Sequence, residues 1–111
     1  MSPIWKFGGA DPAGLRCDNP SRWHPRTLHR VEQHHSPPRS WTTDDGASSA
    51  VVTLCGTCHN EVHALLDLYV HADGAPPWPV LRSFGRFLRS MAAQAWADRT
   101  PGHTPYTVAH P

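Results

Sequence analysis

The sequence has no long hydrophobic run, and this absence excludes a membrane-spanning helix. No stretch reaches the roughly 18 consecutive apolar residues that such a helix needs. Residues Met1 to Ala10 also lack the charged start and apolar middle of a secretory signal peptide. We therefore expect an intracellular, cytoplasmic protein without a membrane partner.

The chain also has little net charge and few cysteines. The formal net charge is only +1, so the chain carries no large basic field that would attract polyanions. Its three cysteines are an odd number, which fits poorly with a fully paired disulfide framework. In a reducing compartment, a Cys-x-x-Cys pair indicates metal or redox chemistry instead. Histidine, by contrast, is abundant, because the nine histidines nearly equal the ten lysines and arginines.

The length of 111 residues predicts one domain with a thin core. The 12 prolines and 8 glycines interrupt regular structure and reduce that core further. Something besides apolar burial is therefore expected to hold the domain together. We expect an irregular arm at residues 1–15, a main domain at 16–74, a helix within 75–99 and a loose tail at 100–111.

Hydrophobic periodicity predicts a small α+β fold. Residues Thr27 to His35 alternate as a weak strand, and the β-branched run from Ala50 to Leu54 follows as a second strand. After Cys58, apolar residues recur every three to four positions up to Asp73–Gly74, which predicts a helix with a glycine stop. A second amphipathic helix is expected from Pro79 to Ala97, because proline favours the first helical position. Its apolar face would consist of Leu81, Phe84, Leu88, Met91 and Ala95.

The cysteines form a first group of potential metal ligands. Cys55 and Cys58 have the Cys-x-x-Cys spacing that lets two thiolates meet at one tetrahedral zinc. Cys17 is the natural third ligand, and the fourth must be a residue other than cysteine, with His24 as first choice and His29 as second. A zinc ion bound there would cross-link the chain and add the stability that the thin core lacks.

Two histidines form a second group. His59 and His63 are spaced i, i+4 on the expected helix, so both imidazoles project from one face and can bind a single metal. Cys58, directly before them, points elsewhere. The sequence therefore predicts two metals with different roles: a closed structural zinc site and a more open histidine site with room for water or substrate.

Together these motifs resemble the HNH endonuclease family, in which a histidine pair on a β-hairpin precedes a helix that carries His-x3-His. The matching segments are VEQHHSPP at residues 31–38 and LCGTCHNEVH at residues 54–63. The resemblance implies the ββα-metal fold, also called the His-Me finger, for the domain at 16–74. The C-terminal helix would pack on this core.

The resemblance also implies a role for each histidine. His35 would be the general base that takes a proton from the attacking water, and His34, His59 and His63 would bind the catalytic divalent metal. Three histidine ligands favour zinc, nickel, cobalt or manganese over magnesium, which prefers oxygen ligands. The implied activity is metal-dependent hydrolysis of phosphodiester bonds, with double-stranded DNA as the expected substrate.

The sequence departs from the family pattern in two places. Residues 36–58 contain no asparagine, although the family carries one there that helps to orient the catalytic histidine. Pro20 stands where a second cysteine would follow Cys17. Two alternatives to an independent nuclease therefore stay open. One is a non-catalytic zinc-binding module for nucleic acid or another partner, and the other is a nuclease subunit that works only in a larger complex, such as a phage packaging terminase in the host cytoplasm.

Four arginines are candidates for phosphate contact. Arg82, Arg86 and Arg89 form a basic edge on the expected second helix at i, i+4 and i+7. Arg39 follows the histidine pair closely in the sequence. The tryptophans are expected to be core residues rather than base-stacking platforms, and they are Trp5, Trp23, Trp41, Trp78 and Trp96.

Overall fold

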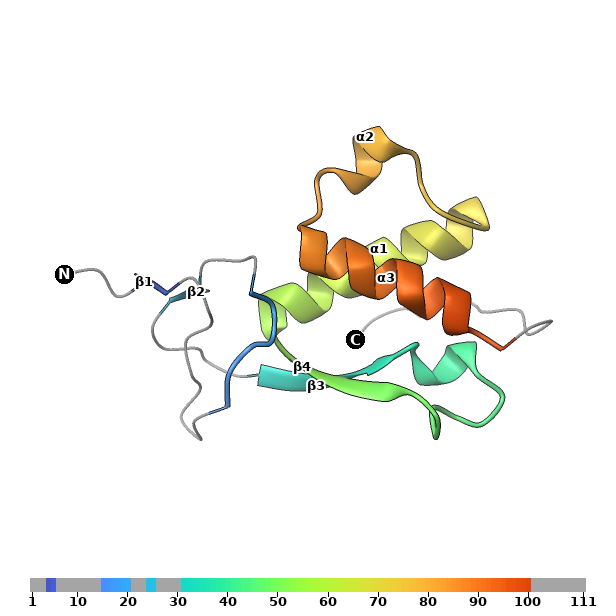
Figure 1. The fold of residues 1–111 in the computed structure, drawn as a ribbon, viewed down its shortest axis with the longest axis horizontal. Helices are drawn as coiled ribbons and strands as arrows, with labels where there is room; N and C mark the ends of the chain where they lie inside the picture. The colour runs from blue at the N-terminus through green and yellow to red at the C-terminus, as the bar shows by residue number, and fades with distance from the viewer. Residues whose placement is uncertain (1–3, 6–14, 21–23, 26–30, 101–111) are drawn as a thin grey trace.

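The computed structural model describes residues 4–5, 15–20, 24–25 and 31–100. The strands form two antiparallel pairs, and the helices lie on one side of the longer pair (Figure 1). This arrangement is the small mixed α+β architecture that the periodicity predicts. In chain order the elements are β1 (Ile4–Trp5), β2 (His24–Pro25), β3 (Val31–Ser36), the 3-10 turn η1 (Arg39–Trp41), β4 (Ala50–Cys55), α1 (Gly56–Ala72), α2 (Trp78–Leu81) and α3 (Arg86–Asp98).

The N-terminal arm contains a strand that the sequence did not predict. Ile4 and Trp5 form β1, which pairs antiparallel with β2 at His24 and Pro25. The expectation of irregular structure is therefore wrong at these two residues, because pairing with a segment about 20 positions away leaves no local pattern to read. The expected tail, apart from Thr100, lies outside the described residues.

The hairpin of β3 and β4 carries the first histidines of the site. The register runs from Val31 opposite Cys55 to Ser36 opposite Ala50. Both predicted strands are confirmed where they are described: β3 covers residues 31–36, and 27–30 lie outside the described residues. β4 leads into α1 without a loop, so the hairpin and the helix hold a fixed relation to each other.

Helix α1 has one fully buried face, made by residues spaced three to four apart, as predicted. It ends at Asp73, which adopts the left-handed conformation at φ 53° and donates its N–H to the Tyr69 and Val70 carbonyls. Gly74 follows with φ 150° and bonds the same Tyr69 carbonyl at 3.1 Å. The helix therefore stops where the glycine signal predicted, although the aspartate takes the left-handed position itself.

The single helix expected from Pro79 to Ala97 is wrong, because the chain forms two helices there. Gly85 has extended backbone angles, φ −67° and ψ 158°, and separates α2 from α3. The Ser83 hydroxyl donates to the Val80 carbonyl at 2.7 Å and thereby competes with continued helical bonding. A consequence is that the three arginines of the expected basic edge no longer share one helix.

The core lies between the β3–β4 hairpin, α1 and α3. Trp41 is 3% exposed and meets Trp96 of α3 edge-on at a centroid distance of 5.6 Å, so the loop after β3 is anchored to the last helix. No helix among the described residues combines the length and apolar character needed to cross a membrane. The largest fully buried side chains are Leu54, Cys58, Val62, Leu65, Leu66 and Leu88.

Candidate metal centres

Three buried thiols converge where β4 meets α1. The Sγ atoms of Cys17, Cys55 and Cys58 all lie within 4.8 Å of one another. Cys17 is brought there by its neighbour Asp18, which pairs with Thr53 of β4 through two bonds of 2.8 and 3.0 Å. The three cysteines that the sequence grouped as zinc ligands are therefore close enough to bind one metal ion.

Hydrogen bonds to sulfur favour a thiolate cluster. The Asn19 side-chain amide donates to Cys58 Sγ at 3.5 Å, and the Cys58 backbone N–H donates to Cys55 Sγ at 3.4 Å. Asn19 is only 2% exposed, so its amide is committed to this site, although sequence reasoning missed it. The Cys55 thiol and burial raise the pKa of Cys17, and the Cys17 and Cys55 thiols together with burial raise the pKa of Cys58. Three such thiols become a stable ligand set when a cation among them compensates for their negative charge.

Among the described residues, this cluster consists of three cysteines without a fourth donor. A structural zinc takes four ligands, and three are accounted for. His24 belongs to β2, but its side chain falls outside the described part, as does the whole of His29. The structure therefore leaves the order of these two candidates as the sequence analysis gave it.

A second donor cluster joins the hairpin to α1. One ring nitrogen each of His34, His59 and His63 lies within 4.8 Å of the others. His59 Nε2 and His63 Nε2 are 3.0 Å apart. In a tetrahedral zinc site, with Zn–N bonds of about 2.0–2.1 Å, two ligand nitrogens are separated by about 3.3 Å. The α1 pair thus needs only a small adjustment to bind one ion.

His34 supplies the clearest sign that this cluster can bind a cation. It is 2% exposed, and its Nε2 atom has no hydrogen-bond partner among the residues that the structure describes. Burying such an atom without a partner costs free energy, so a bound cation or water is expected to satisfy it. Burial, followed by the charges of His63 and His59, lowers the pKa of His34 to about 3. The imidazole is therefore neutral, which is the form that binds a metal.

Glu32 orients one of these ligands and was not predicted. Its Oε1 atom lies 2.9 Å from His59 Nδ1. A carboxylate there accepts a hydrogen bond from Nδ1–H, so Nε2 keeps its lone pair directed toward His63. The signal was present in the sequence: Glu32 and His34 are two residues apart on a strand, and alternate residues of a strand share a face.

Replacing Glu32 with alanine is expected to weaken metal binding at the histidine cluster by about 10- to 100-fold, because His59 loses the group that fixes its tautomer and ring orientation. Glu32→Gln, which retains an acceptor oxygen, is expected to lose less. Titrating Co²⁺ into the zinc-loaded protein and following its visible absorption measures the affinity. Asp73→Asn removes an equal charge at the other end of α1 and should have no effect. Equal cobalt affinities for Glu32→Ala and the parent protein would contradict the role of Glu32.

A pocket of about 400 Å³ opens beside the histidine cluster. His35 is half-buried and lines it together with the three clustered histidines, so the two members of the His34–His35 pair reach the same cavity. The pocket is bounded on the loop side by Arg39 and Asp45, and on α1 by Leu66 and Asp67. It therefore has histidines at one wall and both charge signs at its rim.

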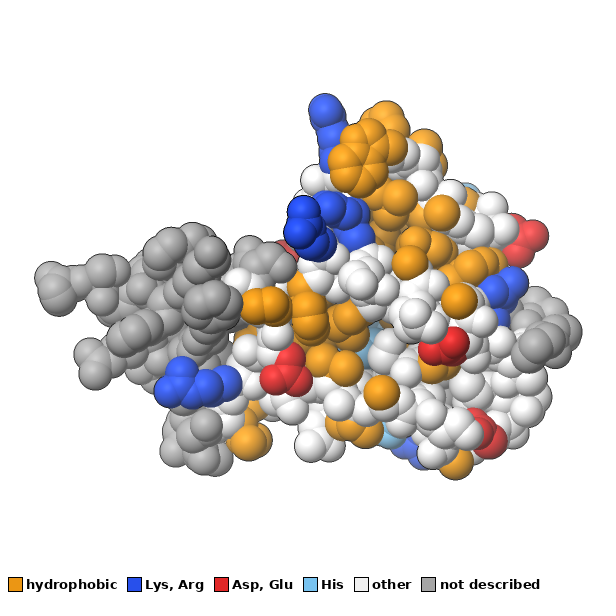
Figure 2. Space-filling model, viewed as in Figure 1, with side chains coloured by type: hydrophobic (Ala, Val, Ile, Leu, Met, Phe, Trp, Pro, Cys, Tyr) orange, Lys and Arg blue, Asp and Glu red, His pale blue; other side chains and the backbone are white. Residues whose placement is uncertain are grey.

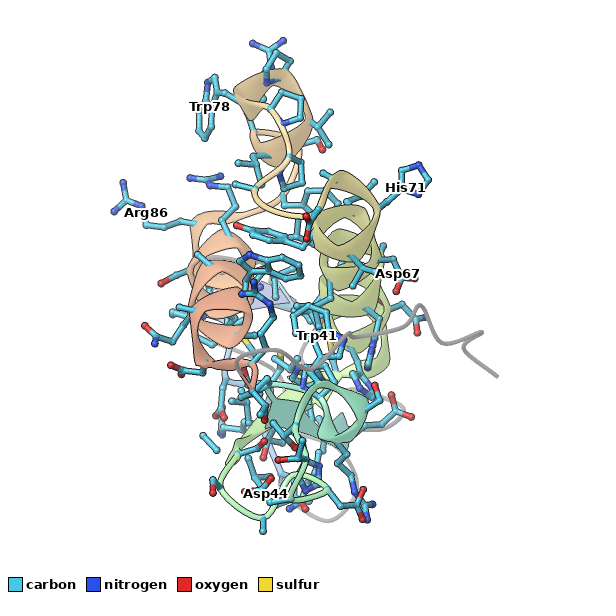
Figure 3. All side chains as sticks on the ribbon, turned by 90° about the vertical axis from the view of Figure 1, so that its right-hand side faces the viewer. Trp41, Asp44, Asp67, His71, Trp78 and Arg86 are labelled. Atoms are coloured by element: carbon cyan, nitrogen blue, oxygen red, sulfur yellow. The ribbon has the colours of Figure 1, made fainter. Side chains whose placement is uncertain are left out.

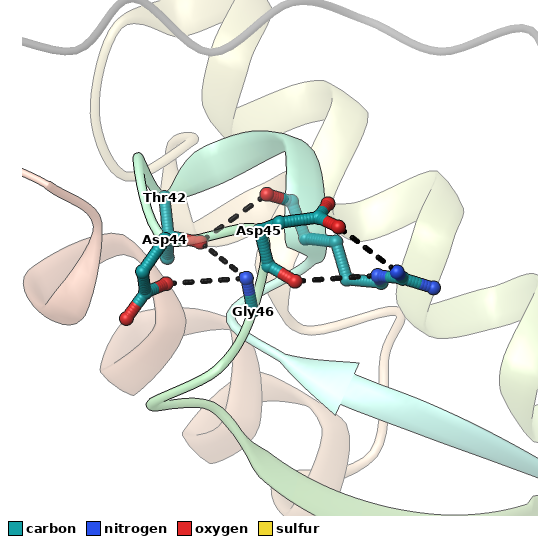
Figure 4. A network of polar contacts seen from close by, with 5 residues as sticks. Thr42, Asp44, Asp45 and Gly46 are labelled. Carbon is teal, nitrogen blue, oxygen red and sulfur yellow. Dashed lines mark hydrogen bonds and ion pairs between the residues drawn. The ribbon is translucent and has the colours of Figure 1, made fainter.

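The loop at the rim is held by a network of polar contacts (Figure 4). Arg39 Nη2 lies 3.0 Å from Asp45 Oδ2, and Arg39 Nε donates to the Asp45 carbonyl at 3.3 Å. The Gly46 N–H is shared between Thr42 Oγ1 at 2.8 Å and Asp44 Oδ1 at 3.1 Å. Gly46 has φ 82°, and a Cβ atom there would lie 2.6 Å from Arg39 Cγ, so the turn requires glycine.

The other predicted phosphate contacts lie away from this pocket. Asp67 lines the pocket from α1, whereas Arg86 projects in the opposite direction from Asp67 and His71 (Figure 3). Arg82 and Arg86 are exposed, and Arg89 is partly buried beside Trp78. Of the four arginines, only Arg39 is placed at the pocket.

The region without the expected asparagine contains a serine bond instead. The Ser49 hydroxyl donates to the Pro37 carbonyl at 2.8 Å, joining the two ends of the loop between β3 and β4. A hydroxyl makes this one connection, whereas an amide side chain can donate and accept at once.

No family model, curated protein or solved structure matches the chain. The likeness to the HNH family therefore rests on the residues quoted above.

Proposed function

We propose that the protein is a metal-dependent endonuclease of the HNH type that hydrolyses phosphodiester bonds in DNA. The observation that carries this proposal is the triad of His34, His59 and His63 at a pocket that His35 also lines. Within the described part of the chain, the buried His34 Nε2 atom of this triad has no hydrogen-bond partner. A closed structural site would not need the cavity or a fourth histidine. The cavity is needed when water and substrate must reach a bound metal, and a histidine outside the ligand set can act as a base.

His35 acts as the general base in the proposed reaction. Its imidazole accepts a proton from a water molecule, and the oxygen of that water forms a new bond to phosphorus while the bond to the 3′ oxygen breaks. The departing 3′ oxygen then takes a proton from solvent. His34, His59 and His63 would hold a divalent metal, which would supply positive charge to stabilise the phosphate and the departing oxygen.

The cysteine cluster has a separate role in the proposal. Cys17, Cys55 and Cys58 hold a structural zinc together with a fourth ligand, His24 in our first assignment. All three cysteines are buried, which suits a closed site without access for substrate. Cys58 and His59 are adjacent on α1, so ordering of the structural site also positions the first ligand of the catalytic metal.

Double-stranded DNA is the proposed substrate, with Arg39 as its first phosphate contact. The Arg39 side chain is 60% exposed at the rim of the pocket, and its partner Asp45 is 77% exposed. An exposed ion pair of this kind contributes about 1 kcal/mol or less, so a DNA phosphate can replace Asp45 at small cost. Because the chain has a net charge of only +1, it should bind DNA weakly outside the site. Weak DNA binding of this kind suits a subunit of a larger DNA-processing complex.

A plasmid-nicking assay with metal add-back tests the proposed activity. The zinc-loaded protein, freed of metal at the histidine site by mild chelation, is expected to nick supercoiled DNA only after Mn²⁺, Ni²⁺, Co²⁺, Zn²⁺ or Mg²⁺ is restored. Circular dichroism and zinc content by mass spectrometry verify that the structural site survives. His71→Ala is the matched control, because His71 is exposed near the end of α1 and does not line the pocket.

Failure with every metal, in protein that is folded and holds zinc, would contradict an independent nuclease. The absence of asparagine from residues 36–58 gives that outcome a physical reason, since His35 would lack an orienting amide. Repeating the assay with lysate from the source cell then separates the two alternatives. Cutting that depends on both lysate and His35 identifies a subunit of a larger complex. If no cutting is seen with lysate either, the protein is a non-catalytic module.

A further inference from the structure

Helix α2 presents an exposed tryptophan. Trp78 is 58% exposed and Val80 is 36% exposed, and α2 stands clear of the α1–α3 pair (Figure 1). The prediction that all five tryptophans are core residues is therefore wrong for Trp78. Trp78 lies between Pro77 and Pro79 at the start of the short helix α2, which the extended backbone at Gly85 separates from α3.

Positive charge lies next to this indole. Residues 74–97 contain three arginines and no aspartate or glutamate. The Arg89 guanidinium carbon lies 5.1 Å from the centre of the Trp78 ring, within the range of a cation–π contact. Arg82 and Arg86 are exposed, and blue side chains adjoin the orange surface of α2 in Figure 2. The surface is thus cationic and aromatic at the same point.

The backbone holds these groups in place. Leu81 and Arg82 donate their N–H groups to the Pro77 and Trp78 carbonyls at 3.0 and 2.8 Å, and Phe84 donates to Leu81 at 2.9 Å. Arg89 Nη1 donates to the Phe84 carbonyl at 2.5 Å, which fixes its guanidinium beside the ring. The Arg89 side chain and the backbone of α2 therefore lose little conformational entropy when a ligand contacts this surface.

We propose that Trp78, Arg82, Arg86 and Arg89 form a binding site for single-stranded nucleic acid. An unpaired base stacks on the exposed part of the indole, and the arginines contact the adjoining phosphates. A duplex offers phosphates to the arginines but keeps its bases stacked on each other, so it cannot use the indole. An acidic peptide likewise matches the charge but has no planar group to cover the ring.

This site is separate from the histidine pocket. Neither Trp78 nor the three arginines line the pocket, and Arg86 points away from the side on which Asp67 lies (Figure 3). The proposal does not rest on the nuclease proposal, since binding is measured without any reaction. If the nuclease proposal also holds, the α2 site would retain a displaced or unpaired strand while the histidine pocket acts elsewhere on the same nucleic acid.

Fluorescence anisotropy with a labelled oligonucleotide of about 15 nucleotides tests the proposal. The full zinc-loaded chain is titrated at low salt, without added divalent metal, against oligo-dT, oligo-U and a DNA duplex of the same length. Trp78→Ala is expected to raise the Kd for both single strands by about 10-fold or more, whereas Trp78→Phe should retain most of the affinity. The double variant Arg82→Gln/Arg86→Gln should weaken binding and flatten its salt dependence.

Two exposed residues outside the patch provide matched controls. Arg16→Gln removes one charge, and Val51→Ala removes exposed apolar surface, since Val51 is 51% exposed on β4. Both should bind like the parent, and thermal melting verifies that every variant is folded. An unchanged Kd in Trp78→Ala overturns the proposal. It is also overturned if the duplex binds as tightly with the same dependence on Trp78, or if a polyglutamate peptide competes as well as the oligonucleotide.

Discussion

Replacing Cys58 with serine is expected to leave most of the protein unfolded at room temperature. Cys58 is fully buried, and its sulfur belongs to the thiol cluster that joins residues 15–20, β4 and α1. In small zinc domains the structural metal contributes about 10–16 kcal/mol, which is as large as the roughly 5–15 kcal/mol of net stability of a whole domain. A serine hydroxyl keeps the size of the side chain and is a far poorer zinc ligand than a thiolate.

Leu65→Ala provides the comparison that separates metal loss from loss of packing. Leu65 is fully buried on the same helix, and its truncation should cost about 2–5 kcal/mol while leaving the zinc content unchanged. Thermal melting by circular dichroism, together with zinc determination by mass spectrometry, measures both variants. Strong chelation should bring the parent down to the stability of Cys58→Ser. If Cys58→Ser melts with the parent and retains its zinc, no structural metal is bound at this cluster.

Local spacing made much of the donor set predictable. An i, i+4 pair on a helix shares a face whatever the rest of the fold does, so His59 and His63 could be grouped from the sequence alone. The turn at Cys55 and Cys58 is fixed in the same local way. His34 and Cys17 join these pairs only through the hairpin register and the Asp18–Thr53 contacts, which no local pattern encodes.

The parts that were missed depend on contacts made in three dimensions. Asn19 contacts Cys58 across 39 positions of sequence, so its role is visible only once both chain segments are placed. Glu32 could be grouped with His34 on one face of the strand, but its contact with His59 depends on how α1 packs on the hairpin. The break at Gly85 has a similar origin, since one glycine is tolerated within many helices. Here α3 packs on α1 while α2 stands apart, and the break at Gly85 exposes Trp78.

Replacing His35 with alanine is expected to reduce DNA nicking by about 10²- to 10⁴-fold, the usual contribution of a general base. His35 lines the pocket but is absent from the donor cluster, so the variant should keep its metal and its fold. His63→Ala, in contrast, should lose both metal and activity, because His63 is one of the three donors. Comparing cobalt affinity with nicking rate in the two variants therefore distinguishes the base from a ligand.

Chemical rescue gives a readout that a structural role would not produce. Removal of the His35 ring leaves space at the pocket wall, and added imidazole should enter it and restore part of the nicking rate in His35→Ala. Across substituted imidazoles of similar size, the rescued rate should follow their pKa values, because a stronger base takes the proton of water more readily. The same compounds should not rescue His63→Ala under identical metal conditions. Full activity in His35→Ala, or loss of its metal or fold, would show that the base lies elsewhere.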